Sequence, residues 1–231
     1  MRRNFGPFSM TLRPGTSDER VVEEVISRHA YRRTRLGFDV EVGERWLDLG
    51  GNIGAFAVYA ALRGARWVQS FEPDPTCFAL LQQNCPPGFN CIRGAVTAHT
   101  TYTIDLFRSA RPADHYRQTT VPSPSMIFAG TVPNWPMRTL CKATFDGIKM
   151  DIEGAEMAIF DAHLLPRTAK LVVEYHTSRD SSTRGLARRL TWLASRFRHV
   201  HAPPEYERIL ASGASTIKTF HDRCIFCWGP K

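Results

Sequence analysis

The sequence predicts an α/β fold, in which helices cover both faces of a mostly parallel sheet. The main observation is that short apolar runs alternate with helical segments through the first half of the chain. The expected strands are 46–49, 67–71 and 89–92, and the expected helices are 53–62 and 76–84. Strands that alternate with helices form parallel sheets, because each helix carries the chain back to the end where the previous strand began.

The same alternation resumes after residue 146. Strands are expected at 147–151 and 170–175, with one helix starting at residue 153 and another spanning 183–197. The last two strands are expected at 199–201 and 223–228. No long helix separates them, so they are predicted to pair in antiparallel orientation.

Two segments lie outside this pattern. Residues 1–40 are predicted to be an N-terminal extension, irregular at 5–15 and then helical after a cap at 16–18. Residues 108–136 contain five prolines and show no clear period. Long loops inside compact domains are usually functional, so we expect a lid or substrate loop there, with a simple insertion as the alternative. The whole chain, 1–231, is predicted to be a single domain.

Composition excludes several classes of protein. Hydrophobic residues make up 43% of the chain and charged residues 23%, which is close to the average of folded domains and excludes global disorder. The longest apolar run, 55–62, is far shorter than the roughly 20 residues of a membrane span. The start of the chain lacks the apolar region of a secretion signal. We therefore expect a cytoplasmic protein without a membrane partner, whose oligomeric state the sequence does not define.

Charge and cysteine content leave the partners open. The net charge is +8, from 30 basic and 22 acidic residues. This excess favours an anionic partner such as a nucleic acid or an acidic glycan, or, since the arginines are spread along the chain, only a solvated surface. Cys224 and Cys227 form a CxxC motif without a second pair, which argues against a zinc ribbon.

The strongest local pattern is Asp48-Leu49-Gly50-Gly51-Asn52-Ile53-Gly54, which follows a predicted strand and opens a helix. Glycines allow a tight turn and a close ligand, and the free amides at a helix start favour an anionic group. A dinucleotide fingerprint needs glycine at i, i+2 and i+5, but those positions hold Gly50, Asn52 and Ala55. Asp48 would repel a diphosphate, and it suits a ligand with an ammonium and a sulfonium group.

A second acid stands at the end of the next predicted strand. Glu72 comes 24 residues after Asp48 and can accept hydrogen bonds from both hydroxyls of a ribose. With the glycine turn, it predicts a nucleoside that carries a zwitterionic tail, as S-adenosylmethionine does. The alternative is an ordinary glycine turn followed by a surface acid.

The ends of two further predicted strands carry acidic side chains and a histidine: Asp151, Glu153, Glu156, Glu174 and His176. Ligands of open parallel sheets bind at the carboxyl ends of the strands. We therefore expect Asp151 and Glu153 to face the same crevice as Asp48 and Glu72. His176 is a candidate base at that rim, with a purely structural histidine as the alternative.

Together these motifs resemble those of the FkbM family of S-adenosylmethionine-dependent methyltransferases. The matching segments are 48–54, 71–75, 148–156 and 172–176, and the opening at 15–19 is also similar. The resemblance implies a Rossmann-like class I methyltransferase fold, with a seven-stranded, mostly parallel sheet whose last strand is antiparallel. It also implies O-methylation of a hydroxyl, usually on a sugar, a glycan or a small metabolite.

By position, the resemblance implies a cofactor site at the ends of the first strands. Its residues would be Asp48, Gly50, Gly51, Asn52, Ile53, Glu72, Pro73, Ala95, Val96 and Asp151. The family often has an aspartate just beyond the loop after the third strand, where this chain has Thr97-Ala98-His99. An adenine contact from that side chain is therefore not predicted.

A hydroxyl acceptor benefits from a base that takes its proton. His176 and Asp151 are the candidate bases, and Glu153 and Glu174 are expected to orient the substrate. Asp151, Glu153 and Glu174 could form an all-oxygen site for Mg²⁺, but a divalent cation is not expected. Two rival functions are a ribose 2′-O-methyltransferase of RNA, favoured by the net charge, and a cofactor-binding module without catalysis.

Overall fold

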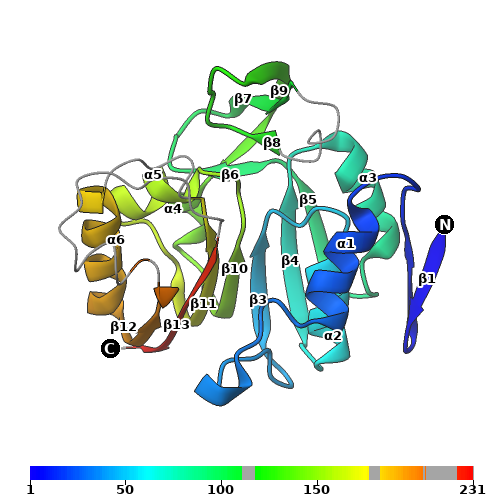
Figure 1. Cartoon of the computed structure of the whole chain (residues 1–231), viewed down its shortest axis with the longest axis horizontal. Coiled ribbons are helices and arrows are strands. Elements are labelled where there is room, and N and C mark those ends of the chain that lie inside the picture. The colour runs from blue at the N-terminus through cyan, green and yellow to red at the C-terminus, as the bar shows by residue number, and fades with distance from the viewer. Residues whose placement is uncertain (111–117, 177–182, 205, 207–222, 231) are drawn as a thin grey trace.

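The computed structural model describes residues 1–110, 118–176, 183–204, 206 and 223–230, and their main element is a seven-stranded mixed sheet (Figure 1). The strand order is β12-β13-β11-β10-β3-β4-β5. The bounds are β3 (Arg45–Leu49), β4 (Trp67–Glu72), β5 (Asn90–Arg93), β10 (Thr144–Met150), β11 (Arg167–Tyr175), β12 (Phe197–His201) and β13 (Arg223–Pro230). The pairs from β11 to β5 are parallel, whereas β13 is antiparallel to both β11 and β12. The expected α/β architecture and the antiparallel pairing of the last two strands are confirmed.

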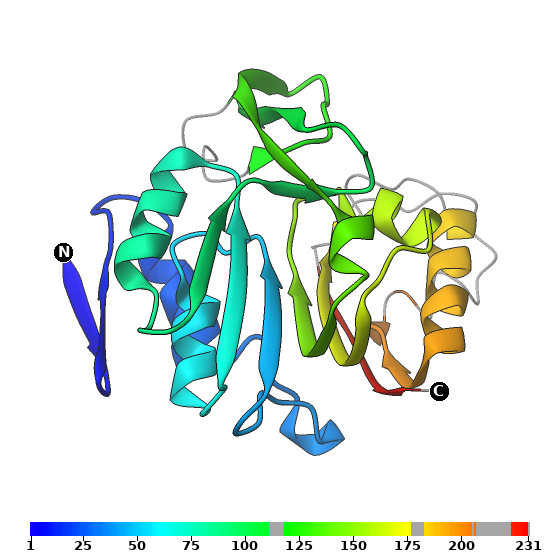
Figure 2. The same cartoon turned by 180° about the vertical axis from the view of Figure 1, so that it is seen from behind.

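Helices cover both faces of this sheet (Figure 2). The chain forms α1 (Asp18–Val22), α2 (Ala55–Leu62), α3 (Pro75–Asn84), α4 (Met137–Leu140), α5 (Glu156–Asp161) and α6 (Thr183–Arg196). Side chains of β3 alternate between two apolar cores, since Trp46 packs with the α2 side and Leu47 with the α5 and α6 side. This period of two is what a strand buried on both faces requires. No helix in the described part of the chain has the length and apolar character to cross a membrane.

The N-terminal segment differs from the prediction. Residues 5–15 were expected to be irregular, but β1 (Arg2–Phe5) and β2 (Phe8–Thr11) form an antiparallel hairpin. Gly6 has a φ of +56°, so it supplies the left-handed turn that joins two paired strands. The predicted helix then follows as α1, continued by a π-helical turn, η1 (Glu23–Ser27), and a 3₁₀ turn, η2 (Thr34–Leu36), comes later.

The segment 108–136 also differs, because it is not a structureless loop. β6 (Ala95–Thr97), β7 (Thr103–Ser109), β8 (Gln118–Thr119) and β9 (Met126–Pro136) form a second, four-stranded sheet. Two of the five prolines, Pro133 and Pro136, lie within β9 itself, and both have partners in the strand register. Residues 111–117 lie outside the described residues. The small sheet stands at the end of the main sheet where β3 and β4 finish (Figure 1).

Gly147 allows the closest approach between β10 and β3. A Cβ atom there would lie 2.3 Å from Cε2 of the buried Trp46 ring. Gly147→Ala is therefore expected to lower the free energy of unfolding by about 1–3 kcal/mol, through overpacking, in urea denaturation. The penalty should shrink in a Trp46→Leu background, where the ring is absent. An equal penalty in both backgrounds would contradict this explanation.

Candidate active site

The Gly50 turn brings two distant parts of the chain into contact. The turn begins where β3 ends, and the amides of Gly50 and Gly51 donate to the carbonyl of Phe71 at 3.0 and 2.8 Å. Gly50 has a φ of +83°, and a Cβ there would lie 1.8 Å from the carbonyl oxygen of Asp151. Only glycine fits this position, and the turn therefore packs directly against Asp151, the residue that follows β10.

Lys149 of β10 contacts this turn, and it was not among the residues predicted from the sequence. Its Nζ lies 3.2 Å from Oδ1 of Asp48 and donates to the carbonyl of Gly50 at 2.6 Å. Ser70 donates to the other oxygen of Asp48 at 2.8 Å. Burial acts to lower the pKa of Lys149, but the charges of Asp48 and Asp151 outweigh it and hold the pKa above its ordinary value.

Asp48 therefore has a different position from the one expected. Its side chain is completely buried and is engaged by Lys149 and Ser70. It lines neither of the two cavities described below. The signal for Lys149 was present in the sequence, since a lysine inside the apolar run Ile148-Lys149-Met150 must find a buried partner.

The first cavity, called the Glu72 cavity, is bounded by the ends of β4 and β6. The predicted residues that line it are Gly50, Asn52, Glu72, Pro73, Ala95, Val96, Asp151 and Glu153. Phe71, Asp74 and Leu106 also line it, although the sequence did not single them out. Ile53 is completely buried and lines neither cavity, so its predicted cofactor contact is not supported by its position.

Glu72 is held in place by the backbone of two loops. Its Oε2 accepts a hydrogen bond from the amide of Asn52, and its Oε1 accepts one from the amide of Asp74, both at 2.8 Å. The side chain is buried, and burial raises its pKa to about 7. Each carboxylate oxygen keeps a second lone pair, which gives the cavity two acceptors fixed side by side.

The second cavity, called the His176 cavity, shares a wall with the first. Gly50, Asn52, Asp151 and Glu153 line both. The His176 cavity adds Gly51, Tyr31, Lys149, Glu174 and His176, together with Arg20, Val21, Glu24 and Val25 of the N-terminal helices. The sequence did not predict that the N-terminal helices contribute, because nothing in their apolar pattern shows which part of the sheet they cover.

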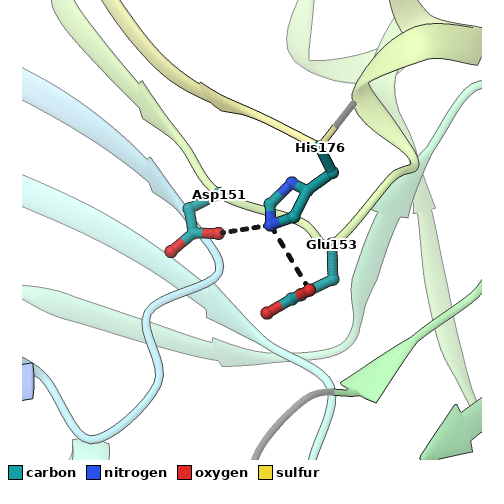
Figure 3. A group of neighbouring side chains, drawn as sticks. All are labelled: Asp151, Glu153 and His176. Atoms are coloured by element: carbon teal, nitrogen blue, oxygen red, sulfur yellow. Dashed lines mark ion pairs between the residues drawn. The ribbon is translucent and has the colours of Figure 1, made fainter. Parts of the chain in front are cut away.

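His176 lies among three carboxylates and is 3% exposed. Its Nδ1 is 2.8 Å from Glu156, and its Nε2 is 3.3 Å from Glu153 and 3.7 Å from Asp151 (Figure 3). Burial acts to lower the pKa of His176, but the charge and hydrogen bond of Glu156 outweigh it, and the pKa lies well above its ordinary value. Nδ1 is therefore engaged by Glu156, while Nε2 faces Glu153 and Asp151. The role of His176 as a base stays a prediction.

The other two predicted catalytic acids lie beside His176. Glu153 has a φ of +53°, an unfavourable conformation for this residue type, and its carbonyl accepts a hydrogen bond from Thr119 at 2.6 Å. Burial, followed by the charge of Asp151, raises the pKa of Glu174 to about 8. The structure therefore brings Asp151, Glu153, Glu174 and His176 together at one cavity, as the sequence predicted.

The segment predicted to be a lid contacts the Glu72 cavity. Gln118 and Thr119 of β8 line that cavity, and Nε2 of Gln118 donates to Asp74 at 2.6 Å. Neither residue lines the His176 cavity. A role of this segment in covering an acceptor stays a prediction.

A family model, the Methyltransferase FkbM domain, matches residues 48–202. This is more than half of the chain, and the chain belongs to the FkbM methyltransferase family. Membership in this family implies S-adenosylmethionine as the methyl donor.

Comparison with other proteins gives more distant similarities. No curated protein matches the chain. Among solved structures, the chain is similar to an S-adenosylmethionine-dependent methyltransferase from Mesorhizobium loti, with 13% identity and a TM-score of 0.45, over 85% of this chain and 95% of that one. It is also similar to a protein from Thermoplasma acidophilum, with 14% identity and a TM-score of 0.42, over 86% of this chain and 79% of that one.

The Lys149–Asp48 pair can be tested by removing one charge. Lys149→Met should lower the free energy of unfolding by about 3–5 kcal/mol, because it leaves Asp48 buried and unpaired. Lys142→Met, at an exposed position, should change it by less than about 0.5 kcal/mol. Both are measured by urea denaturation. The double variant Asp48→Asn/Lys149→Met should recover part of the loss, and no recovery would contradict the charge-based explanation.

Proposed function

We propose that this chain is an S-adenosylmethionine-dependent O-methyltransferase that acts on a hydroxyl of a sugar, a glycan or a small metabolite. The observation that supports the proposal is the shared wall of the two cavities. Asp151 and Glu153 line both the Glu72 cavity and the cavity that holds Glu174 and His176. A donor in one cavity and an acceptor in the other would meet at these two carboxylates.

The residues of the Glu72 cavity fit the implied cofactor. The two fixed oxygens of Glu72 match the paired hydroxyls of a ribose. Pro73, Ala95 and Val96 offer apolar surface for an adenine ring next to them. Gly50 and Asn52 line both cavities, and the amino acid end of the cofactor would lie on their His176 side. When bound, S-adenosylmethionine supplies an electrophilic methyl group on sulfur.

The carboxylate cluster is suited to a hydroxyl acceptor. Methyl transfer to a hydroxyl forms a C–O bond, breaks a C–S bond and leaves a proton that a base must take. Asp151 and Glu153 are the acids that reach both cavities, so we assign proton acceptance to this pair. His176 and Glu174 line the cavity assigned to the acceptor, which suits them to orienting it.

The domain organisation follows from the same proposal. We take the chain to be one methyltransferase domain, with residues 1–40 as its N-terminal extension and residues 108–136 as the cover of the substrate. The strand order β12-β13-β11-β10-β3-β4-β5 supports a Rossmann-like class I arrangement.

RNA is the competing acceptor, because the chain has a net charge of +8. Part of the arginine excess is used within the fold. Arg13 pairs with Asp18, Arg32 and Arg63 pair with Asp39, and Arg188 and Arg189 pair with Asp161. These five arginines are held by aspartates of the fold, although the net charge of +8 already counts those aspartates.

The proposed function is tested by offering S-adenosylmethionine with two panels of acceptors. One panel contains sugars, glycans and hydroxylated small molecules, and the other contains single- and double-stranded RNA. Formation of S-adenosylhomocysteine is measured, and products are checked by mass for one added methyl group on oxygen. Transfer to the first panel is expected. Transfer only to RNA, or only to nitrogen or carbon, would refute the proposal.

The raised pKa of Glu72 predicts a pH-dependent cofactor affinity. Ribose hydroxyls bind the ionised carboxylate, and a pKa of about 7 means that the carboxylate becomes protonated as the pH falls through neutrality. Affinity for S-adenosylhomocysteine, measured by calorimetry, should therefore rise between about pH 6 and 8 and then level off. The neighbouring charges of Asp74 and Lys149 partly cancel in setting this value.

Glu72→Gln is the matched variant for this prediction. It should weaken binding by about 1.5–3 kcal/mol and remove the dependence on pH, because a charge-assisted acceptor is lost. Glu41→Gln, at an exposed position before β3, should leave both unchanged. A wild-type affinity that is flat across this pH range would contradict the assignment of Glu72 to the ribose.

A variant of Glu153 distinguishes an effect on cofactor binding from an effect on turnover. Glu153→Gln should lower turnover by roughly 10²–10⁴-fold if the carboxylate positions the acceptor or takes its proton. The affinity for S-adenosylhomocysteine should stay nearly unchanged, since the ribose contacts are assigned to Glu72. Turnover is measured once an acceptor is identified, with Glu41→Gln as the control. Near-normal turnover would exclude Glu153 from the reaction.

A further inference from the structure

We propose that Asp151, Glu153 and His176 form a binding site for a divalent metal ion. One oxygen of each carboxylate and one ring nitrogen of His176 all lie within 4.8 Å of one another. Ligand atoms that share a cation at roughly 2.1 Å lie about 3–4 Å apart, so only a small adjustment is needed. Figure 3 shows both carboxylates and Nε2 converging on one point.

The orientation of His176 is fixed by a residue outside this group. Glu156 is completely buried, and its Oε1 binds both Nδ1 at 2.8 Å and the backbone amide of His176 at 2.9 Å. Its other oxygen accepts from the amide of Gly154 at 2.8 Å. A histidine that binds a metal through one nitrogen commonly donates its other N–H to a carboxylate, which sets the tautomer and the ring plane. Glu156 supplies this contact and directs Nε2 toward Asp151 and Glu153.

The donor set differs from the all-oxygen site considered from the sequence. In the described part of the chain, His176 takes the place of Glu174 in the group of converging ligands. One imidazole nitrogen with two carboxylate oxygens suits Mn²⁺ and other first-row divalent ions better than Ca²⁺ or Mg²⁺, which prefer oxygen ligands. The nearby charges also favour a cation, since the carboxylates of Glu24, Asp151, Glu153 and Glu174 outnumber the basic side chains of Arg20 and Lys149 among the described residues that line this cavity.

Three protein ligands leave coordination positions open, and the cluster faces a cavity of about 160 Å³. This part of the inference rests on the proposed function. Adjacent hydroxyls of a sugar could occupy the open positions, and coordination lowers the pKa of a bound hydroxyl. The metal would then hold the acceptor at the wall that the two cavities share.

The test uses the full chain, stripped with EDTA and dialysed, without S-adenosylmethionine or acceptor. Binding of MnCl₂ is followed by the loss of the electron paramagnetic resonance signal of free Mn²⁺. The wild-type chain should bind one Mn²⁺. Asp151→Asn and Glu153→Gln should each weaken binding by at least about tenfold. Because both side chains are partly exposed, these variants should keep the fold, which circular dichroism checks, and Glu41→Gln is the control.

Absence of bound Mn²⁺ at millimolar concentration, or equal binding by both variants and the control, would overturn the inference. These outcomes are independent of the proposed function. If Mn²⁺ does not bind as described but methyl transfer to hydroxyls proceeds in EDTA, the metal site is refuted and the proposed function stands. If Mn²⁺ binds as described but no hydroxyl is methylated, the proposed function fails and the metal site stands.

Discussion

The buried ion pair between Lys149 and Asp48 is the interaction on which the rest of the site depends. The two residues are register partners on adjacent parallel strands, and Ser70 is the partner of Asp48 on the next strand. Lys149 also binds the carbonyl of Gly50, so one ammonium group fixes the end of β3 relative to β10. A charge buried in this way is costly unless it is paired, and here the two charges are paired with each other. The positions of Asn52 and Asp151 follow from it.

Several acidic residues lie around this turn, and their surroundings decide which of them can bind a ligand. Glu72 is held by two backbone amides and offers two acceptors to a ligand. Glu156 is committed to His176, and Asp48 is committed to Lys149. Among the acidic residues that the structure describes, only Asp151 and Glu153 line both cavities. All of these side chains carry a carboxyl group, so the differences between their roles arise from their burial and their hydrogen-bond or ion-pair partners.

The fold was predictable where the hydrophobic period was clear, and the site was predictable where motifs stood at strand ends. Asp151, Glu153, Glu174 and His176 line one cavity, and Glu72 lines a neighbouring cavity that shares Asp151 and Glu153. The second sheet was not predicted, because prolines usually interrupt strands and the segment contains several of them. Pro133 nevertheless occupies a paired position within β9. The burial of Asp48 against Lys149 was not predicted, for a physical reason: a carboxylate in a motif can face a ligand or a buried lysine, and the register of β3 with β10 is not visible in the sequence. Similarly, the charge state of His176 depends on three carboxylates that come from distant positions.

The central claim is that a nucleoside bound at Glu72 and an acceptor bound near His176 meet at Asp151 and Glu153. A crystal structure of the chain with S-adenosylhomocysteine tests it most directly. The account predicts both ribose hydroxyls within hydrogen-bond distance of the Glu72 carboxylate, and the sulfur atom facing Asp151 and Glu153. A nucleoside bound outside the Glu72 cavity, or a sulfur atom directed away from these two carboxylates, would contradict it.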